Sequence, residues 1–318
     1  MLKALSRLGF GAVLASSILV GSPAVRAEQF VNVLTGGTSG VYYPLGVALA
    51  KIYSDAIPDA RTSVQATKAS VENLNLLQQG KGEIAFTLGD SLVLAYKGDA
   101  EAGFSAPLDK LRGIAGIYPN YVQVVATADS GIKSLADLKG KRLSVGAAKS
   151  GTELNARAIL KAAGLTYDDL GKVEYLPFAE SVDLMKNRQL DATLQSAGLG
   201  VASIRDLAAS VPIVIVPVPA DLVQQIGTPY QPATVPAGTY TGQDVDVPTA
   251  AIENFLVTQS EVSDDLAYGM TKALWEHLDE LGSAHAAAKA IARERALTGM
   301  PVPLHPGAER YYREQGML

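Results

Sequence analysis

Glycine and hydroxyl residues that can bind an anion come together near the amino terminus, in Gly36-Gly37-Thr38-Ser39-Gly40-Val41-Tyr42-Tyr43. This stretch follows the apolar run 30–34, which predicts a strand, and precedes an apolar stripe from Leu45 to Tyr53 with helical spacing. Such a loop presents backbone N–H groups, hydroxyls and the positive end of a helix dipole in one place. The spacing fits neither nucleotide-binding glycine motif, and no lysine follows the last glycine. A tight turn without a ligand is the alternative.

Polar residues also lie at or just after the ends of four later predicted strands, at Lys68-Ala69-Ser70, Ser91, Ser150-Gly151-Thr152-Glu153 and Gln195. Ligands of open α/β sheets bind beyond the carboxyl ends of the strands, so we expect these segments to line one cleft. Helices that begin near Tyr42, Ser70 and Ser150 direct N–H groups into such a cleft, which suits a carboxylate. Ser150 and Glu153 also match the S-x-x-E capping box, which is a structural role for both.

Residues for catalysis are poorly represented. The chain has no Cys, which excludes thiolate nucleophiles, disulfides and Cys-based metal sites. Its histidines are His277, His285 and His305, and no H-E-x-x-H motif or i, i+4 pair occurs among them. We therefore expect no metal, no cofactor and no catalytic residue. A hydrolase or transferase on an α/β frame is the less supported alternative, because triad partners need not be neighbours in sequence.

The amino terminus predicts export. Residues 1–27 have a positive start, an apolar run from Leu8 to Val20 that is too short to span a bilayer, and small residues at Val25 and Ala27. We expect a signal peptide that is cleaved after Ala27 and a mature chain in the periplasm. The formal net charge of the whole chain is −5, which argues against a nucleic-acid partner.

Strand and helix patterns alternate along the rest of the chain and predict an α/β protein with largely parallel sheets. Helices are expected to begin near residues 42, 70, 150 and 263, and residues 228–248 are expected to form loops because they are rich in Pro, Gly and Thr. The predicted strands are 30–34, 62–66, 84–88, 111–118, 121–127, 142–145, 173–176, 192–195, 213–216 and 251–257.

Five segments together resemble one family, the TAXI solute receptors of tripartite ATP-independent periplasmic (TRAP) transporters. The resemblance covers nearly the whole mature chain, and its pieces occur in the family's order. They are Gly36-Gly37-Thr38-Ser39-Gly40-Val41-Tyr42-Tyr43-Pro44-Leu45-Gly46, Leu138-Lys139-Gly140-Lys141-Arg142, Ser150-Gly151-Thr152-Glu153, Asp244-Val245-Asp246-Val247-Pro248-Thr249 and His305-Pro306-Gly307-Ala308.

The resemblance implies a two-lobed type II periplasmic binding protein fold with the ligand cleft between the lobes. Lobe one would comprise residues 28–120 and 219–318, and lobe two residues 121–218, with crossovers near Tyr118-Pro119-Asn120-Tyr121 and Pro217-Val218-Pro219. Such receptors close on glutamate, glutamine or a related small carboxylate and deliver it to an ion-driven membrane permease. A subunit that senses a ligand for a membrane kinase is an alternative that the sequence leaves open.

We assign expected roles on this basis. Thr38 and Ser39, with the N–H groups near Gly37, would bind a carboxylate from lobe one, and Tyr42 would cover the apolar part of the ligand. The remaining contacts would come from Ser150, Gly151, Thr152, Ser91 and Gln195. Lys68 departs from the family pattern, which usually has a small residue there; it would either pair with an anionic ligand or remain a solvated surface lysine.

Overall fold

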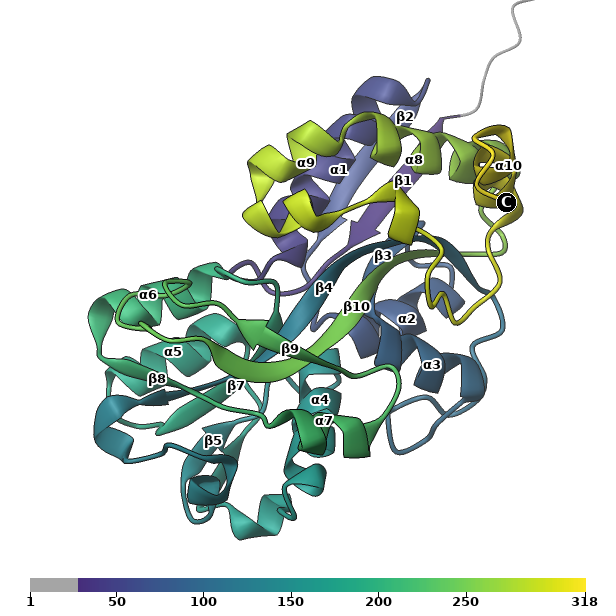
Figure 1. Ribbon diagram of the computed structural model, residues 1–318. Helices are drawn as coiled ribbons and strands as arrows, with labels where there is room; N and C mark the ends of the chain where they lie inside the picture. Colours follow the sequence, from purple (N-terminus) through teal and green to yellow (C-terminus); the bar gives the residue numbers. More distant parts are fainter. Residues whose placement is uncertain (1–27) are drawn as a thin grey trace, which may run out of the picture.

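The computed structural model describes residues 28–318, so the expected signal peptide and its cleavage site lie outside the described residues. Figure 1 shows two α/β halves joined by two long strands, β4 (Leu111–Thr127) and β10 (Val247–Gln259), which extend from one half into the other. These two strands pair antiparallel from Leu111–Gln259 to Tyr121–Ala251. The sheet therefore continues through both halves.

The first half repeats a strand–helix unit around a parallel core. Its elements are β1 (Gln29–Leu34), α1 (Tyr42–Ala56), β2 (Ala60–Gln65), α2 (Ser70–Gln78), β3 (Ile84–Leu88) and α3 (Gly89–Lys97). Strands β2, β1 and β3 are parallel neighbours, and β10 pairs antiparallel with β3. The apolar stripe of α1, including Leu45, Leu49 and Ile52, is buried as its periodicity predicted.

The second half uses the same plan. Its elements are β5 (Arg142–Ser144), α4 (Gly151–Ala162), β6 (Lys172–Glu174), α5 (Phe178–Lys186), β7 (Ala192–Ala197), α6 (Ala202–Ser210), β8 (Ile213–Val216), α7 (Ala220–Ile226) and β9 (Gln231–Val235). The strand order is β2-β1-β3-β10-β4-β7-β5-β6, with β8 paired to β4 and β9 to β10.

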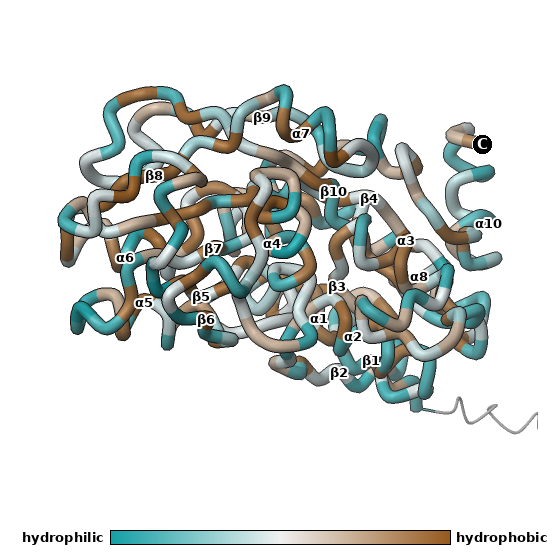
Figure 2. Tube along the Cα trace, turned by 90° about the horizontal axis from the view of Figure 1, so that it is seen from below, coloured by the Kyte–Doolittle hydropathy of each residue, from teal (hydrophilic) through white to brown (hydrophobic). Residues whose placement is uncertain are grey.

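The carboxyl-terminal helices return to the first half. After β10 the chain forms α8 (Asp264–Glu276), α9 (Leu278–Ala284) and α10 (Pro306–Glu314), and α8 and α9 pack on α1. In Figure 2 the central strands are largely brown, and α10 and the outer turns are largely teal. Short 3₁₀ turns occur at Ala128–Ser130, Leu135–Leu138, Tyr167–Asp169, Ala286–Ala290 and Arg293–Arg295. No helix within residues 28–318 is long and apolar enough to cross a membrane.

The structure differs from the sequence-based elements at three places. The predicted strands 111–118 and 121–127 form the single strand β4, because Pro119 is accommodated within the ladder and the register shifts between Glu253 and Phe255. Residues 89–91, where β3 was expected to end in a loop, begin helix α3. Part of the expected loop region 228–248 forms β9, which pairs with β10.

The segment 219–246 packs with the second half. Val223 of α7 and Tyr230 belong to the same buried cluster as Ile159 of α4, and β9 pairs with the beginning of β10. The sequence analysis placed this segment in lobe one, with a crossover at Pro217-Val218-Pro219. Its contacts lead us to propose instead that lobe two extends to the beginning of β10, and that the chain crosses back within that strand.

Two of the expected helix starts have a serine cap in the structure, and a third does not. Ser150 accepts a hydrogen bond from the N–H of Glu153 at 3.1 Å, and Ser263 accepts one from Leu266 at 3.3 Å. Ser70 does not cap α2, because its hydroxyl accepts the N–H of Leu88 at 3.1 Å.

His305 is a buried helix cap. It lies just before α10 and is 0% exposed. Its Nδ1 accepts the N–H of Gly307 at 3.2 Å, and its Nε2 lies 2.9 Å from the carbonyl of Val262. These contacts suit a neutral ring with its proton on Nε2. Burial lowers the pKa of His305, because the charged form loses hydration.

We predict that His305 makes stability fall in mild acid. A histidine with a lowered folded pKa contributes its full stability above its ordinary pKa of 6.5 and loses it as pH falls from there through the folded pKa. Protonation of Nδ1 also removes the cap of α10, which is worth about 1 kcal/mol. Urea unfolding of the wild type and of His305→Asn between pH 8 and pH 5 checks this, because Asn can cap the helix but does not titrate. Parallel stability curves for the two proteins would contradict it.

Candidate functional site

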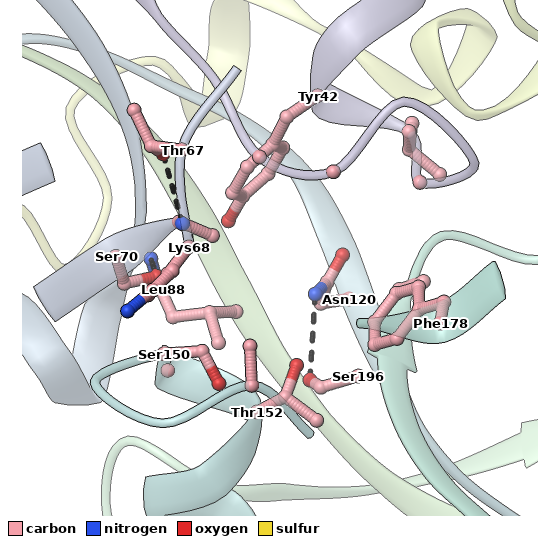
Figure 3. A pocket seen from close by; sticks show the side chains of 18 of the residues that line it. Tyr42, Thr67, Lys68, Ser70, Leu88, Asn120, Ser150, Thr152, Phe178 and Ser196 are labelled. Carbon is pink, nitrogen blue, oxygen red and sulfur yellow. Dashed lines mark hydrogen bonds between the residues drawn. The ribbon is translucent and has the colours of Figure 1, made fainter. Parts of the chain in front are cut away.

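A cavity of about 100 Å³ lies between the two halves, where four helices begin. Helices α1 and α2 begin there from the first half, and α4 and α5 from the second. Figure 3 shows Tyr42 of α1 on one side and Thr152 and Phe178, of α4 and α5, on the other. Asn120 lies between them and is hydrogen-bonded to Ser196. The cavity thus lies beyond the carboxyl ends of strands, as the sequence analysis expected.

The surroundings of the cavity favour a negative charge. The first N–H groups of each helix lack helical acceptors, and each helix start carries about half a positive charge. Lys68 also lines the cavity, and its amino group forms no ion pair with the residues that the structure describes. Four helix starts and one cation therefore act on the same small space.

A chain of hydrogen bonds forms the floor of the cavity. The hydroxyl of Tyr42 donates to Oδ1 of Asn254, a buried residue of β10. Nδ2 of Asn254 donates to Oδ1 of Asn120 at 2.9 Å and to the carbonyl of Tyr118 at 2.8 Å. Nδ2 of Asn120 then reaches Oγ of Ser196 at 3.4 Å. The chain of bonds connects α1 with β10, β4 and β7, and so spans both halves.

Tyr42 is held rigidly in this floor. Its ring stacks on Phe86 of β3, with ring centroids 5.0 Å apart. Burial raises the pKa of Tyr42 well above its usual range, so the phenol stays neutral and acts as a hydrogen-bond donor. The sequence analysis expected Tyr42 to contact the ligand, and Tyr42 lines the cavity.

The loop before α2 has an uncommon backbone conformation. Ala69 has φ 70° and ψ −145°, a region that L-residues other than glycine rarely adopt. Its N–H donates to Oγ1 of Thr67 at 2.9 Å. The buried amide of Asn73 supports the loop by donating to the carbonyls of Thr35 at 2.6 Å and Phe86 at 2.9 Å. These bonds hold Lys68 and the start of α2 at the cavity.

The two halves touch beside the cavity. A Cβ built on Gly151 at the start of α4 would lie 2.7 Å from Oγ of Ser70, 2.8 Å from Cδ1 of Leu88 and 2.9 Å from Oγ of Ser91. Glycine permits this close approach because it has no side chain.

A buried carboxylate joins the halves next to this contact. Oδ2 of Asp90, in α3, accepts Nδ2 of Asn155 at 2.6 Å and the hydroxyl of Tyr230 at 2.7 Å. Asn155 and Tyr230 both belong to the second half. Burial raises the pKa of Asp90, and its hydrogen bonds partly oppose that rise.

Six of the ten predicted site residues line the cavity: Gly37, Tyr42, Lys68, Ser150, Gly151 and Thr152. Four do not. Thr38 is exposed and Ser39 partly exposed, because the glycine loop turns outward before α1. Ser91 lies behind Gly151, and its backbone N–H donates a hydrogen bond to Oδ1 of Asp90. Gln195 is on a fully buried strand and accepts Oγ of Ser203 at 2.6 Å.

Glu153 differs from the expected capping box. It follows the helix cap, but its carboxylate accepts Nε of Arg157 at 2.6 Å and the hydroxyl of Tyr167 at 2.8 Å. The carboxylate of Glu153 therefore does not accept a hydrogen bond from the backbone N–H of Ser150, as a capping box would require.

Several cavity residues were not assigned to the site by the sequence analysis. Ser196 is next to the predicted Gln195, and side chains alternate along a strand, so a shift of one position selects the wrong face. Phe178 follows β6 and starts α5, so the rule used for the other strand ends would have found it. Tyr118 and Asn120 were placed only at a chain crossover by the sequence analysis, and both line the cavity.

A model of the NMT1-like family matches residues 33–316 of the chain. Similar solved structures include PhnD1 from Prochlorococcus marinus in complex with methylphosphonate, with a TM-score of 0.57, 13% identity, and 91% of this chain and 99% of that chain covered. They also include a putative L-cystine ABC transporter from Listeria monocytogenes, with a TM-score of 0.52, 15% identity, and coverage of 84% and 98%. The expected two-lobed α/β fold of periplasmic binding proteins is thereby confirmed; the narrower TAXI assignment stays a prediction.

We predict that Gly151→Ala destabilises the contact between the halves. The added methyl group would overlap three side chains, and such overpacking typically costs about 1–3 kcal/mol. Gly282→Ala is the matched control, because the nearest atom to its added Cβ is 3.5 Å away and alanine favours helix α9. Free energies of unfolding from urea titration check this. An unchanged value for Gly151→Ala would contradict the close approach of α4 to the first half.

Proposed function

Because the chain belongs to the NMT1-like family, we propose that it is a solute-binding receptor that captures a small carboxylate by hinge closure and delivers it to a membrane permease. In this proposal the chain binds its ligand without catalysing a reaction. The observation that carries the proposal is the meeting of four helix starts and Lys68 at one cavity between two halves. Helix starts and a lysine are the groups that proteins commonly use to bind carboxylates and other anions.

Contacts to the ligand come from both halves in this proposal. Gly37, Tyr42 and Lys68 contribute from the first half, and Ser150, Gly151 and Thr152 from the second. A ligand that touches both sides stabilises the closed arrangement by its differential contacts. Strands β4 and β10 connect the halves and carry the hinge.

The proposed partner is the membrane permease of a TRAP transporter, on the strength of the five segments that resemble TAXI receptors. Export by the segment before Glu28 and location in the periplasm belong to the same proposal. A permease of the ABC type is the second candidate partner, favoured by the likeness to the putative L-cystine ABC transporter. Affinity capture of the chain by each class of permease, reconstituted in lipid nanodiscs, separates the two.

A thermal-shift screen of the refolded mature chain tests the receptor function. The panel contains amino acids including glutamate and glutamine, C4 and C5 dicarboxylates, and short monocarboxylates. A ligand at 100 times its Kd stabilises the fold by roughly 2.7 kcal/mol, which is readily measured. A shift with at least one carboxylate is expected. A panel without any shift would refute the carboxylate receptor.

We predict that Lys68→Ala weakens binding of the carboxylate that this screen identifies. A partly exposed ion pair contributes about 1 kcal/mol or less, which corresponds to a loss of up to about fivefold in affinity. The affinity of the wild type should also fall more steeply with added salt than that of the variant. Lys133→Ala is the matched control, because Lys133 is also exposed but does not line the cavity. Equal affinity and equal salt dependence of the two variants in calorimetric titrations would leave Lys68 as a solvated lysine.

A further inference from the structure

One buried amide side chain joins three segments of the chain beside the cavity. Asn73 lies in the first turn of α2 and is 0% exposed. Its Nδ2 donates to the carbonyl of Thr35, just after β1, at 2.6 Å and to the carbonyl of Phe86, in β3, at 2.9 Å. Its Oδ1 lies 2.6 Å from the hydroxyl of Thr67, in the loop before α2. Asn73 therefore fixes the positions of these three segments relative to one another.

The turn before α2 is held by side chains at two successive peptide groups. The hydroxyl of Thr67 accepts the N–H of Ala69 at 2.9 Å and lies 2.9 Å from the carbonyl of Thr35. Oε2 of Glu72 accepts the preceding N–H, that of Lys68, at 2.6 Å. Because Thr67 also contacts Asn73, the turn and the end of β1 belong to one network of hydrogen bonds.

This network surrounds a residue in an unfavourable backbone conformation. Ala69, with φ 70° and ψ −145°, occupies a region that glycine adopts readily and alanine does not. Such a conformation persists only where the surrounding structure enforces it, and residues of this kind are concentrated at functional sites. A Cβ built on Gly36 would lie 3.3 Å from the Cβ of Ala69, so the strained turn also packs against the glycine loop before α1.

The strained turn leaves the start of α2 directed at the cavity. Figure 3 shows Thr67, Lys68 and Ser70 on one side of the cavity that they line. Ala69 has no side-chain group that could cap α2, and the hydroxyl of Ser70 is bound to the N–H of Leu88 instead. The first N–H groups of the helix also lack helical acceptors. Donors that are ordered in advance bind more tightly, because no free energy is lost in ordering them.

We propose that Thr67 and Asn73 are positioning residues for the ligand. They hold Ala69 in its strained conformation and so keep the starts of α1 and α2 in their binding arrangement before a ligand arrives. This inference rests on the proposed receptor function and adds residues that act through the turn. The alternative is that the same bonds only stabilise the fold.

Replacement of the Thr67 hydroxyl tests the role in binding. Thr67→Val is nearly isosteric and removes the hydroxyl, whereas Thr67→Ser keeps it. Calorimetric titrations use L-glutamate, glutarate and butanoate, one compound from each class of the screening panel. For a compound that the wild type binds, Thr67→Val should bind about fivefold to tenfold more weakly, the usual effect of one hydrogen bond, and Thr67→Ser should retain most of the affinity.

The outcomes separate this inference from the receptor proposal. If the wild type binds a compound and Thr67→Val binds it equally well, the inference fails and the receptor remains. An equal loss in Thr67→Val and Thr67→Ser would also overturn the inference, because the hydroxyl would then not be responsible. If the wild type binds no compound of the whole panel, the receptor proposal and this inference fail together.

Amide hydrogen exchange without ligand distinguishes positioning from a general loss of stability. In Thr67→Val the amide of Ala69 loses its acceptor, so it should exchange at least tenfold faster than in the wild type. The amides of β1 and β3 should keep their wild-type rates. Faster exchange throughout the first half would indicate that the bonds only stabilise the fold, and would overturn the inference.

The variant Ala69→Gly tests the strain itself. Glycine adopts this conformation freely, so the urea midpoint should not fall, whereas the added backbone freedom should weaken binding about twofold to fivefold. Asp59→Gly is the matched control: Asp59 also has a positive φ, of 59°, but it lies between α1 and β2 and does not line the cavity. It should keep the wild-type affinity. Weaker binding in both glycine variants, or in neither, would contradict a role for the strained turn in binding.

Discussion

The antiparallel pairing of β4 with β10 is the constraint on which the cavity depends. Both strands extend from one half into the other, and their ladder continues past Pro119 by a shift of register. Asn120 and Asn254 face each other near that point and join the hydrogen bonds of the floor. Parallel strands of each half end at the same place, because β3 and β7 flank this central pair. The helix starts therefore converge as a result of the sheet order.

Local sequence patterns were sufficient for the elements around the glycine loop. The apolar run 30–34, the glycines and the helical stripe from Leu45 specify strand, turn and helix within one continuous stretch, and α1 and β1 follow. Ser150 likewise indicates the start of α4, because a helix cap is a contact between residues that are close in sequence. These are the parts of the site that the sequence could predict.

The remaining parts depend on contacts between distant segments. Asn254 reaches the cavity only because β10 lies beside β4, and nothing near it in sequence indicates a ligand site. Gln195 was predicted for the site in place of Ser196, because alternation along a strand shows which side chains face the cavity only once the exact register is known. The solved structures with a similar fold are only 13–15% identical to this chain, so the fold persists through extensive sequence change and does not by itself specify a ligand site.

The bonds of Asp90 to Asn155 and Tyr230 also bear on how strongly a ligand is held. They form between the protein's own residues in the two halves, so in the proposed hinge mechanism they favour the closed form before a ligand binds. The apparent dissociation constant of a receptor rises as its binding-competent fraction falls. A receptor that is largely closed without ligand therefore loses little of the ligand's binding free energy to closure. In the proposed receptor, the same bonds would set the work that a membrane partner must do to separate the halves and release the ligand.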